Sequence, residues 1–125
     1  MKVKRAVPTD QELEILKVVW QRGQATVRET FDELAKHRKI AYTTVLTMMG
    51  VLEHKGHLKK SRGEKAYVYT PVEPQGETQQ RMVKEFVDRV FNGSTKPLLV
   101  HLVDRNMSQD ELAEIEALVK EKRKK

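Results

Sequence analysis

Residues 43–70 read TTVLTMMGVLEHKGHLKKSRGEKAYVYT, and within them the hydrophobic period changes from that of a helix to that of strands. Apolar residues first recur at helical spacing, at Val45, at Met48 or Met49, and at Leu52. This spacing predicts a helix over residues 43–54 that stops at Lys55-Gly56. The segments 57–62 and 66–70 then face each other across Gly63-Glu64, which predicts a β-hairpin with a basic tip.

Two further helices are predicted before this stretch, because a Ser/Thr-x-x-Glu capping box precedes each of them. Thr9 with Glu12 begins a helix over 10–22 that ends at Gly23, and Thr26 with Glu29 begins a helix over 27–37. The apolar residues expected to face the core are Leu13, Leu16, Val19 and Trp20 in the first helix and Val27, Phe31 and Leu34 in the second.

After the hairpin, Pro71–Gly76 is predicted to be a linker between a domain of residues 1–72 and a helical domain of residues 76–122. Apolar stripes and a third capping box at Ser108 and Glu111 predict the later helices. A second copy of the chain is expected to cover these stripes, and the alternative is an intramolecular bundle with the first domain. The expected dimer interface consists of Met82, Val83, Phe86, Val87, Val90, Phe91, Leu98, Leu99, Leu102, Leu112, Ile115, Leu118 and Val119.

Positive charge is concentrated in one internal block of the 125-residue chain, whose pI is about 9.6. Residues 36–65 hold eight basic and two acidic side chains, so this block alone carries +6, the same as the whole chain. The tail Lys120–Lys125 adds +4, and the rest of the chain is neutral or mildly acidic. A basic block of this kind favours an acidic partner such as a nucleic acid.

Three helices followed by a basic hairpin is the order of a winged helix-turn-helix, in which the third helix enters the major groove and the wing approaches the DNA backbone. We therefore expect a mainly α fold with a small hairpin, a DNA-binding domain and a C-terminal helical dimerisation domain. The expected DNA contacts are Tyr42, Thr43, Thr44 and Thr47 on the third helix, and Lys55, Lys59, Lys60, Arg62, Lys65 and Tyr67 at and beyond its end.

Other readings of the same pattern stay open. A winged-helix module could use the third helix and the hairpin to bind an acidic protein surface, and salt dependence of duplex binding separates this from DNA recognition. RNA binding is disfavoured because the hairpin tyrosines lack a partner sheet of stacking aromatics.

The sequence excludes several classes of protein. It has no cysteine, hence no disulfide and no Cys-containing metal site, and no cofactor is expected. No apolar run reaches about 18 residues, and the basic Met1–Arg5 start leads into Pro8, so a membrane span and a secretory signal are disfavoured and a cytoplasmic location is expected. His54 and His57 are three residues apart but lie on either side of the predicted helix end at Lys55-Gly56, with two lysines nearby, and His37 and His101 have no carboxylate at ligand spacing, so no metal site is expected. No hydrolase or nucleotide-binding motif is present, so an enzyme is not expected either.

Four stretches, in this order, resemble the penicillinase-repressor family (BlaI/MecI/CopY): Thr9–Trp20, Thr44–Met49, Leu52–Gly56 and Tyr67–Pro71. The resemblance spans nearly the whole chain. It implies a dimeric winged-helix repressor that binds a palindromic operator.

Three departures from the family pattern change what the resemblance implies. Ala41 stands where the family often has a Ser N-cap before the third helix. The cysteine-rich C-terminal signature of the copper-responsive members is absent, which argues against copper sensing. In the β-lactam-responsive members a sensor protease cuts an Asn-Phe bond, so the resemblance implies such a partner, but His101-Leu102 occupies the matching position here.

Overall fold

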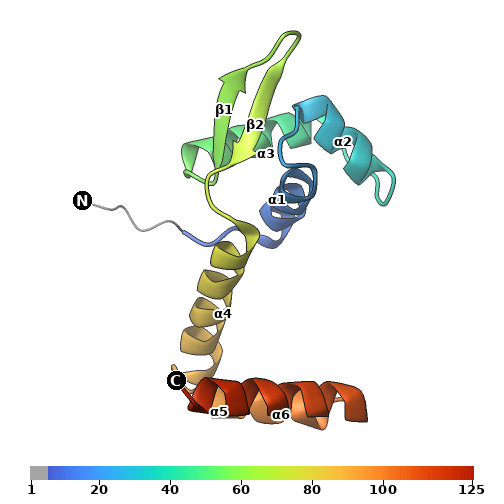
Figure 1. Ribbon diagram of the computed structural model, residues 1–125. Coiled ribbons are helices and arrows are strands. Elements are labelled where there is room, and N and C mark those ends of the chain that lie inside the picture. The colour runs from blue at the N-terminus through green and yellow to red at the C-terminus, as the bar shows by residue number, and fades with distance from the viewer. Residues whose placement is uncertain (1–5) are drawn as a thin grey trace, which may run out of the picture. The chain divides into compact units, whose positions relative to one another are not determined.

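A computed structural model of the protein describes residues 6–125; the Met1–Arg5 start, which entered the argument about a secretory signal, lies outside the described residues. Its elements are α1 (Asp10–Arg22), α2 (Val27–Ala35), α3 (Tyr42–His54), β1 (Leu58–Arg62), β2 (Tyr67–Pro71), α4 (Gln75–Phe91), α5 (Thr95–Asp104) and α6 (Gln109–Arg123) (Figure 1). This confirms the predicted fold class of helices with one antiparallel hairpin. In the described part of the chain no helix is long and apolar enough to cross a membrane.

All three predicted capping boxes are present. At α1 the Thr9 hydroxyl accepts from the Glu12 N–H (3.2 Å) and the Glu12 carboxylate accepts from the Thr9 N–H (3.0 Å). Thr26 and Glu29 cap α2 in the same way, as Ser108 and Glu111 cap α6. By contrast α3 begins after Ala41 without a side-chain cap, as expected of an alanine.

The first three helices and the hairpin share one core. Its fully buried large side chains include Ile15, Leu16 and Val19 from α1, Val45, Met49 and Leu52 from α3, and Leu58 from β1. Met49 therefore takes the inward position, and Met48 is only half buried.

The inward face of α1 was predicted in part. Leu16 and Val19 are buried and the half-buried Trp20 packs against the same core, but Leu13 is only half buried, and Ile15 and Val18, which were not predicted, are buried. The reason is that α1 packs against α2, α3 and β2, so the covered arc is wider than one stripe and is displaced from the predicted one.

The hairpin is fixed both to the helices and at its own turn. Ala25, between α1 and α2, exchanges two backbone hydrogen bonds with Tyr69 of β2 (3.0 and 2.8 Å). At the tip, Gly63 donates to the Ala66 carbonyl (3.0 Å), and the loop takes the four residues 63–66, one more than the predicted strand bounds leave. A Cβ at Gly63 would stand 2.6 Å from that carbonyl oxygen, which explains the glycine.

The predicted linker Pro71–Gly76 is shorter in the structure, because Pro71 ends β2 and Gln75 already begins α4. The connection is also held in place at Glu73. Its carbonyl accepts a hydrogen bond from the Trp20 indole (3.1 Å), and its carboxylate binds Thr78 (2.6 Å) and Arg81 in the first turns of α4.

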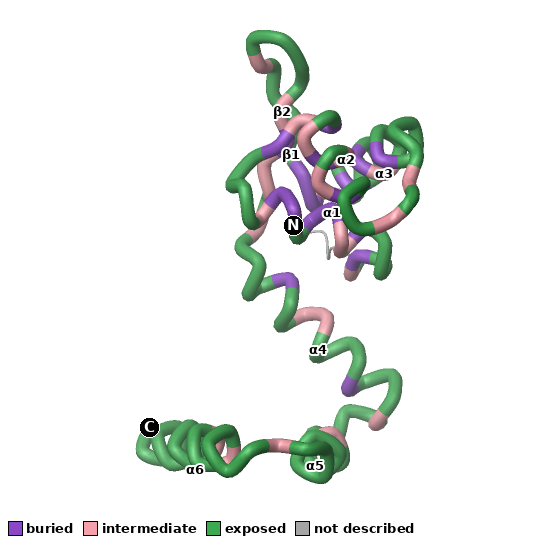
Figure 2. The backbone as a smooth tube through the Cα atoms, turned by 90° about the vertical axis from the view of Figure 1, so that its right-hand side faces the viewer, coloured by how far each residue is buried: buried purple, intermediate pink, exposed green. Residues whose placement is uncertain are grey.

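By its contacts the chain divides into one unit ending at Met82 and a second unit, Val83–Lys125. The domain boundaries predicted from the sequence, at 72 and 76, remain predictions. Within the second unit, all of which is described, only Val87 is buried. Phe91 contacts the rings of Phe86 (5.9 Å between centroids) and His101 (5.8 Å), but α5 and α6 are exposed along almost their whole length (Figure 2).

Candidate nucleic-acid interface

Helix α3 presents the predicted polar face to solvent. Tyr42, Thr43, Thr44 and Thr47 are all exposed. Thr43 and Thr47 lie on the side away from the buried Val45, whereas Tyr42, at the first position of the helix, lies toward α2. Thr43 and Thr47 are four residues apart and so lie one above the other on the helix. A threonine here offers a hydroxyl that can donate or accept and a methyl group that can contact thymine.

Tyr42 has a second role at the start of this helix. Its ring meets the Phe31 ring edge-on, with centroids 5.7 Å apart, and the Arg28 guanidinium lies 4.6 Å from its centroid. These contacts hold the first turn of α3 against α2. These contacts help to stabilise the start of α3, where Ala41 provides no side-chain cap.

The basic residues of the hairpin lie on two different faces. The register pairs Lys60 with Tyr69 and Arg62 with Tyr67. Because side chains alternate along a strand, Lys60, Arg62 and Tyr67 share the face that carries the buried Tyr69, whereas Lys59 lies on the opposite face. The Lys60 amine lies 4.4 Å from the centroid of the Tyr67 ring.

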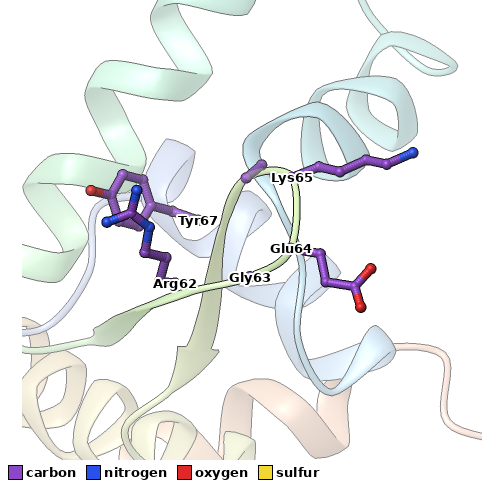
Figure 3. Close-up of a pocket in the computed structure, with 6 residues that line it drawn as sticks. Arg62, Gly63, Glu64, Lys65 and Tyr67 are labelled. Atoms are coloured by element: carbon purple, nitrogen blue, oxygen red, sulfur yellow. The ribbon is translucent and has the colours of Figure 1, made fainter.

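At the tip, a hollow of about 230 Å³ is lined by the residues of the turn. Figure 3 shows the Arg62 and Tyr67 side chains projecting to one side of the loop and Glu64 and Lys65 to the other. Arg62 and Lys65, which the sequence groups together at the tip, are thus directed apart.

Ion pairs divide the +6 block into two groups. Three of its eight cations are bound by carboxylates of α1 and α2: Lys36 by Glu33 (3.3 Å), Arg38 by Glu14 (3.2 Å) and Lys55 by Glu12 (2.9 Å). The other five have no carboxylate within 4.0 Å among residues 6–125: Lys39, Lys59, Lys60, Arg62 and Lys65. Four of these five lie on the hairpin, so the hairpin carries the uncompensated charge.

Lys55, one of the predicted DNA contacts, is held by Glu12, which is 5% exposed. Burial raises the pKa of Glu12, but the hydrogen bond from the Thr9 backbone and the Lys55 amine outweigh it and hold this pKa below its usual 4.5. Lys55 thereby joins the end of α3 to the start of α1. Its contact with DNA remains a prediction.

Glu12→Gln is expected to destabilise the fold by about 2 kcal/mol at pH 7, because a charge-assisted hydrogen bond and ion pair are lost. A folded-state pKa below 4.5 means that this stability is present above pH 4.5 and is lost as the pH falls through the folded value. The gap in Tm between the wild type and the variant should therefore shrink below pH 4.5.

The matched control is Glu14→Gln, which breaks the half-exposed pair with Arg38. An exposed pair of this kind contributes less than about 1 kcal/mol. Thermal unfolding of the three proteins between pH 3 and pH 7 is the measurement. A gap for Glu12→Gln that stays constant with pH would contradict the assigned pair.

Arg28 was missed by the sequence analysis, because it lies outside the basic block. Its exposed guanidinium stands beside a groove of about 200 Å³ between the start of α2, α3 and β2. The groove is lined by Thr26, Val27, Arg28, Tyr42, Leu46, Ala66, Tyr67 and Tyr69. The signal that could have found Arg28 is its position in the first turn of α2, just after the Thr26 cap.

Comparison with known proteins gives a consistent result. The family model described as penicillinase repressor matches residues 8–121. The penicillinase repressor of Bacillus licheniformis is 26% identical over 114 residues, covering 90% of this chain and 89% of the relative. The transcriptional regulator BlaI of Mycobacterium tuberculosis is 33% identical over 117 residues, covering 86% of this chain and 84% of the relative.

A solved structure of the Bacillus licheniformis BlaI monomeric form, in complex with the blaP half-operator, is also similar. It aligns with a TM-score of 0.52 at 31% identity and covers 59% of this chain and 90% of that one. A solution structure of the DNA-binding domain of the repressor BlaI gives the same TM-score of 0.52 at 30% identity.

Proposed function

The chain belongs to the penicillinase repressor family, and from this premise we propose that it is a homodimeric transcriptional repressor that binds a palindromic DNA operator. Helix α3 would read the major groove and the hairpin would hold the adjacent phosphates. A relative in complex with a half-operator supports this role for the aligned part of the chain. The proposal locates the protein in the cytoplasm, together with the DNA that it regulates.

The observation that carries the proposal is the distribution of uncompensated charge. Lys60 and Arg62 share one face of the hairpin, and neither has a carboxylate partner in the described part of the chain. Phosphate neutralisation by such cations provides most of the sequence-independent affinity for DNA. Arg28, at the start of α2, adds a third candidate phosphate contact on the other side of the groove beside α3, although its guanidinium also has the Asp32 carboxylate at 3.9 Å.

The second unit supports self-association. Nine large apolar side chains of Val83–Lys125 are exposed in the single chain: Val83, Phe86, Val90, Leu99, Val100, Leu102, Val103, Leu118 and Val119. Val83, Phe86 and Val90 recur at i, i+3 and i+7 and so form one stripe on α4, and monomeric soluble proteins rarely leave a large contiguous apolar patch open to water. A two-fold dimer would cover these groups on both copies at once and would place two α3 helices on two half-sites.

Selection of bound duplexes from a random pool is the direct test. We expect inverted half-sites at a fixed spacing, because a two-fold protein reads a two-fold site. Single half-sites without a fixed partner would contradict the dimeric mode of binding. Failure to enrich any sequence, together with a flat dependence on salt, would instead favour binding of an acidic protein surface.

Thr47→Ala is expected to reduce discrimination between the selected duplex and a scrambled one by about tenfold, because a lost base contact costs about 1–3 kcal/mol. Thr47 is exposed, so the fold should keep its Tm. Competition binding with both duplexes measures the ratio. An equal loss of affinity for both duplexes would count against base reading by Thr47.

A sensor protease is the remaining partner implied by the resemblance. The bond at the matching position, His101–Leu102, lies inside α5. A helical peptide bond is not presented in the extended form that a protease binds, so α5 must unwind locally before cleavage. We therefore propose that such a partner would act on an opened form of α5.

A further inference from the structure

Gly50 occupies an unexpected place for a glycine, in the interior of α3. Glycine is the least favourable residue in a helix interior apart from proline, because it gives up the most backbone freedom. Two local reasons usually account for such a residue: a positive φ, or a close neighbour that leaves no room for a Cβ.

Neither reason applies to Gly50. The glycines with positive φ are Gly23, Gly56 and Gly93 among the described residues. A Cβ built on Gly50 meets no atom within 4 Å, so the fold of this chain has room for a side chain there. Within the single chain, alanine would therefore be the better residue at this position.

The position of Gly50 on the helix indicates why a side chain is absent there. Gly50 comes seven residues after Thr43 and three after Thr47, so the three residues lie on the same face of α3. This is the exposed face, opposite the buried Val45 and Leu52. Thr43 and Gly50 are about 10 Å apart along the helix axis, which separates the first and third turns.

We propose that Gly50 is a positioning residue for DNA binding, whose missing side chain lets the third turn of α3 lie against the floor of the major groove. An α-helix with side chains is about 10–12 Å wide and the major groove is about 12 Å wide, so the fit leaves little spare room. A methyl group at residue 50 would hold this turn about 1.5 Å farther out and tilt Thr43 and Thr47 away from their bases. The inference rests on the proposed function.

The test compares Gly50→Ala with Gly76→Ala. Gly76 is a matched control, because it also lies in a helix, in the first turn of α4, has no positive φ and has nothing within 4 Å of a built Cβ. Both variants should keep or raise the Tm. On the duplex selected by the wild type, Gly50→Ala should bind about tenfold more weakly and Gly76→Ala should bind like the wild type. Gly50→Gln, with a longer side chain, should lose more.

The outcomes distinguish failure of the proposed function from failure of the role proposed for Gly50. If the wild type enriches no duplex from the pool, the proposed function fails and the role of Gly50 fails with it. If the wild type binds its selected duplex and Gly50→Ala binds equally well, only the role of Gly50 is overturned. A Tm lowered by Gly50→Ala would also overturn it, because the glycine would then serve the fold.

Discussion

Replacing Lys60 and Arg62 together by alanine is expected to weaken binding to every duplex, selected or scrambled, by on the order of 30-fold at physiological salt. Both side chains lie on one face of the hairpin and have no acidic partner in the described part of the chain, so phosphates are their natural counterions. Each phosphate contact contributes about 0.9 to the slope of log affinity against log salt. The double variant should therefore lower the magnitude of this slope by about 1.8.

Two single variants serve as controls for the geometry of the hairpin. Lys59 lies on the opposite face, and Lys65 projects to the other side of the tip from Arg62 (Figure 3). Lys59→Ala and Lys65→Ala each remove one charge, as each half of the double variant does, but should change the slope less. If each single variant changed the slope by half as much as the double variant does, net charge would matter and the two faces of the hairpin would not.

A change in the discrimination between selected and scrambled duplexes would also contradict the assignment of Lys60 and Arg62 to the phosphates. Phosphate contacts carry no sequence information, so the ratio of affinities for the selected and scrambled duplexes should be unchanged in the double variant. Fluorescence anisotropy titrations over a range of salt concentrations give both the slope and the ratio. A slope that stays at the wild-type value would show that Lys60 and Arg62 do not contact the backbone.

The sequence located the positive charge but could not say which cations remain uncompensated. The basic block is visible in the order of residues, whereas its acidic partners are spread over other helices. Glu12 binds Lys55 across 43 positions of sequence, and no local pattern reports that contact. Three of the eight cations therefore have carboxylate partners, and only the folded chain shows that most of the uncompensated charge lies on the hairpin.

Local features were predictable because they depend on neighbours in sequence. A capping box needs two residues three apart, and the one at Thr9 forms as expected. The exposed face of α3 follows from helical spacing, once the apolar residues are assigned to the core. The burial of Ile15 and the anchoring of Glu73 to Trp20 depend on elements far away in sequence, and neither was predicted.

Leu118→Glu is expected to convert a dimer at micromolar concentration into a monomer. Leu118 is 69% exposed in the single chain, so the substitution should not disturb the helix on which it lies. At a two-fold interface the change occurs twice, and losing two buried leucines costs about 4 kcal/mol, or a factor of about a thousand in the dimer constant. Two carboxylates placed in an apolar contact would add to that cost.

Gln109→Glu is the matched control, because it adds the same charge at an exposed position of α6 where no apolar contact is expected. Sedimentation velocity should show a dimer for the wild type and for this control, and a monomer for Leu118→Glu. A wild type that sediments as a monomer at micromolar concentration would overturn the proposed homodimer. A dimeric Leu118→Glu would place Leu118 outside the interface.

The effect of Leu118→Glu on DNA binding distinguishes the contribution of self-association from that of base contacts. Leu118→Glu leaves α3 and the hairpin untouched, so its affinity for a duplex with one half-site should match that of the wild type. On a duplex with two half-sites the wild type gains from joining both contacts in one particle, and the variant loses that gain. We therefore expect a loss on the order of 100-fold for the two-site duplex alone. An equal loss on both duplexes would mean that the second unit acts on DNA binding by a route other than pairing two copies.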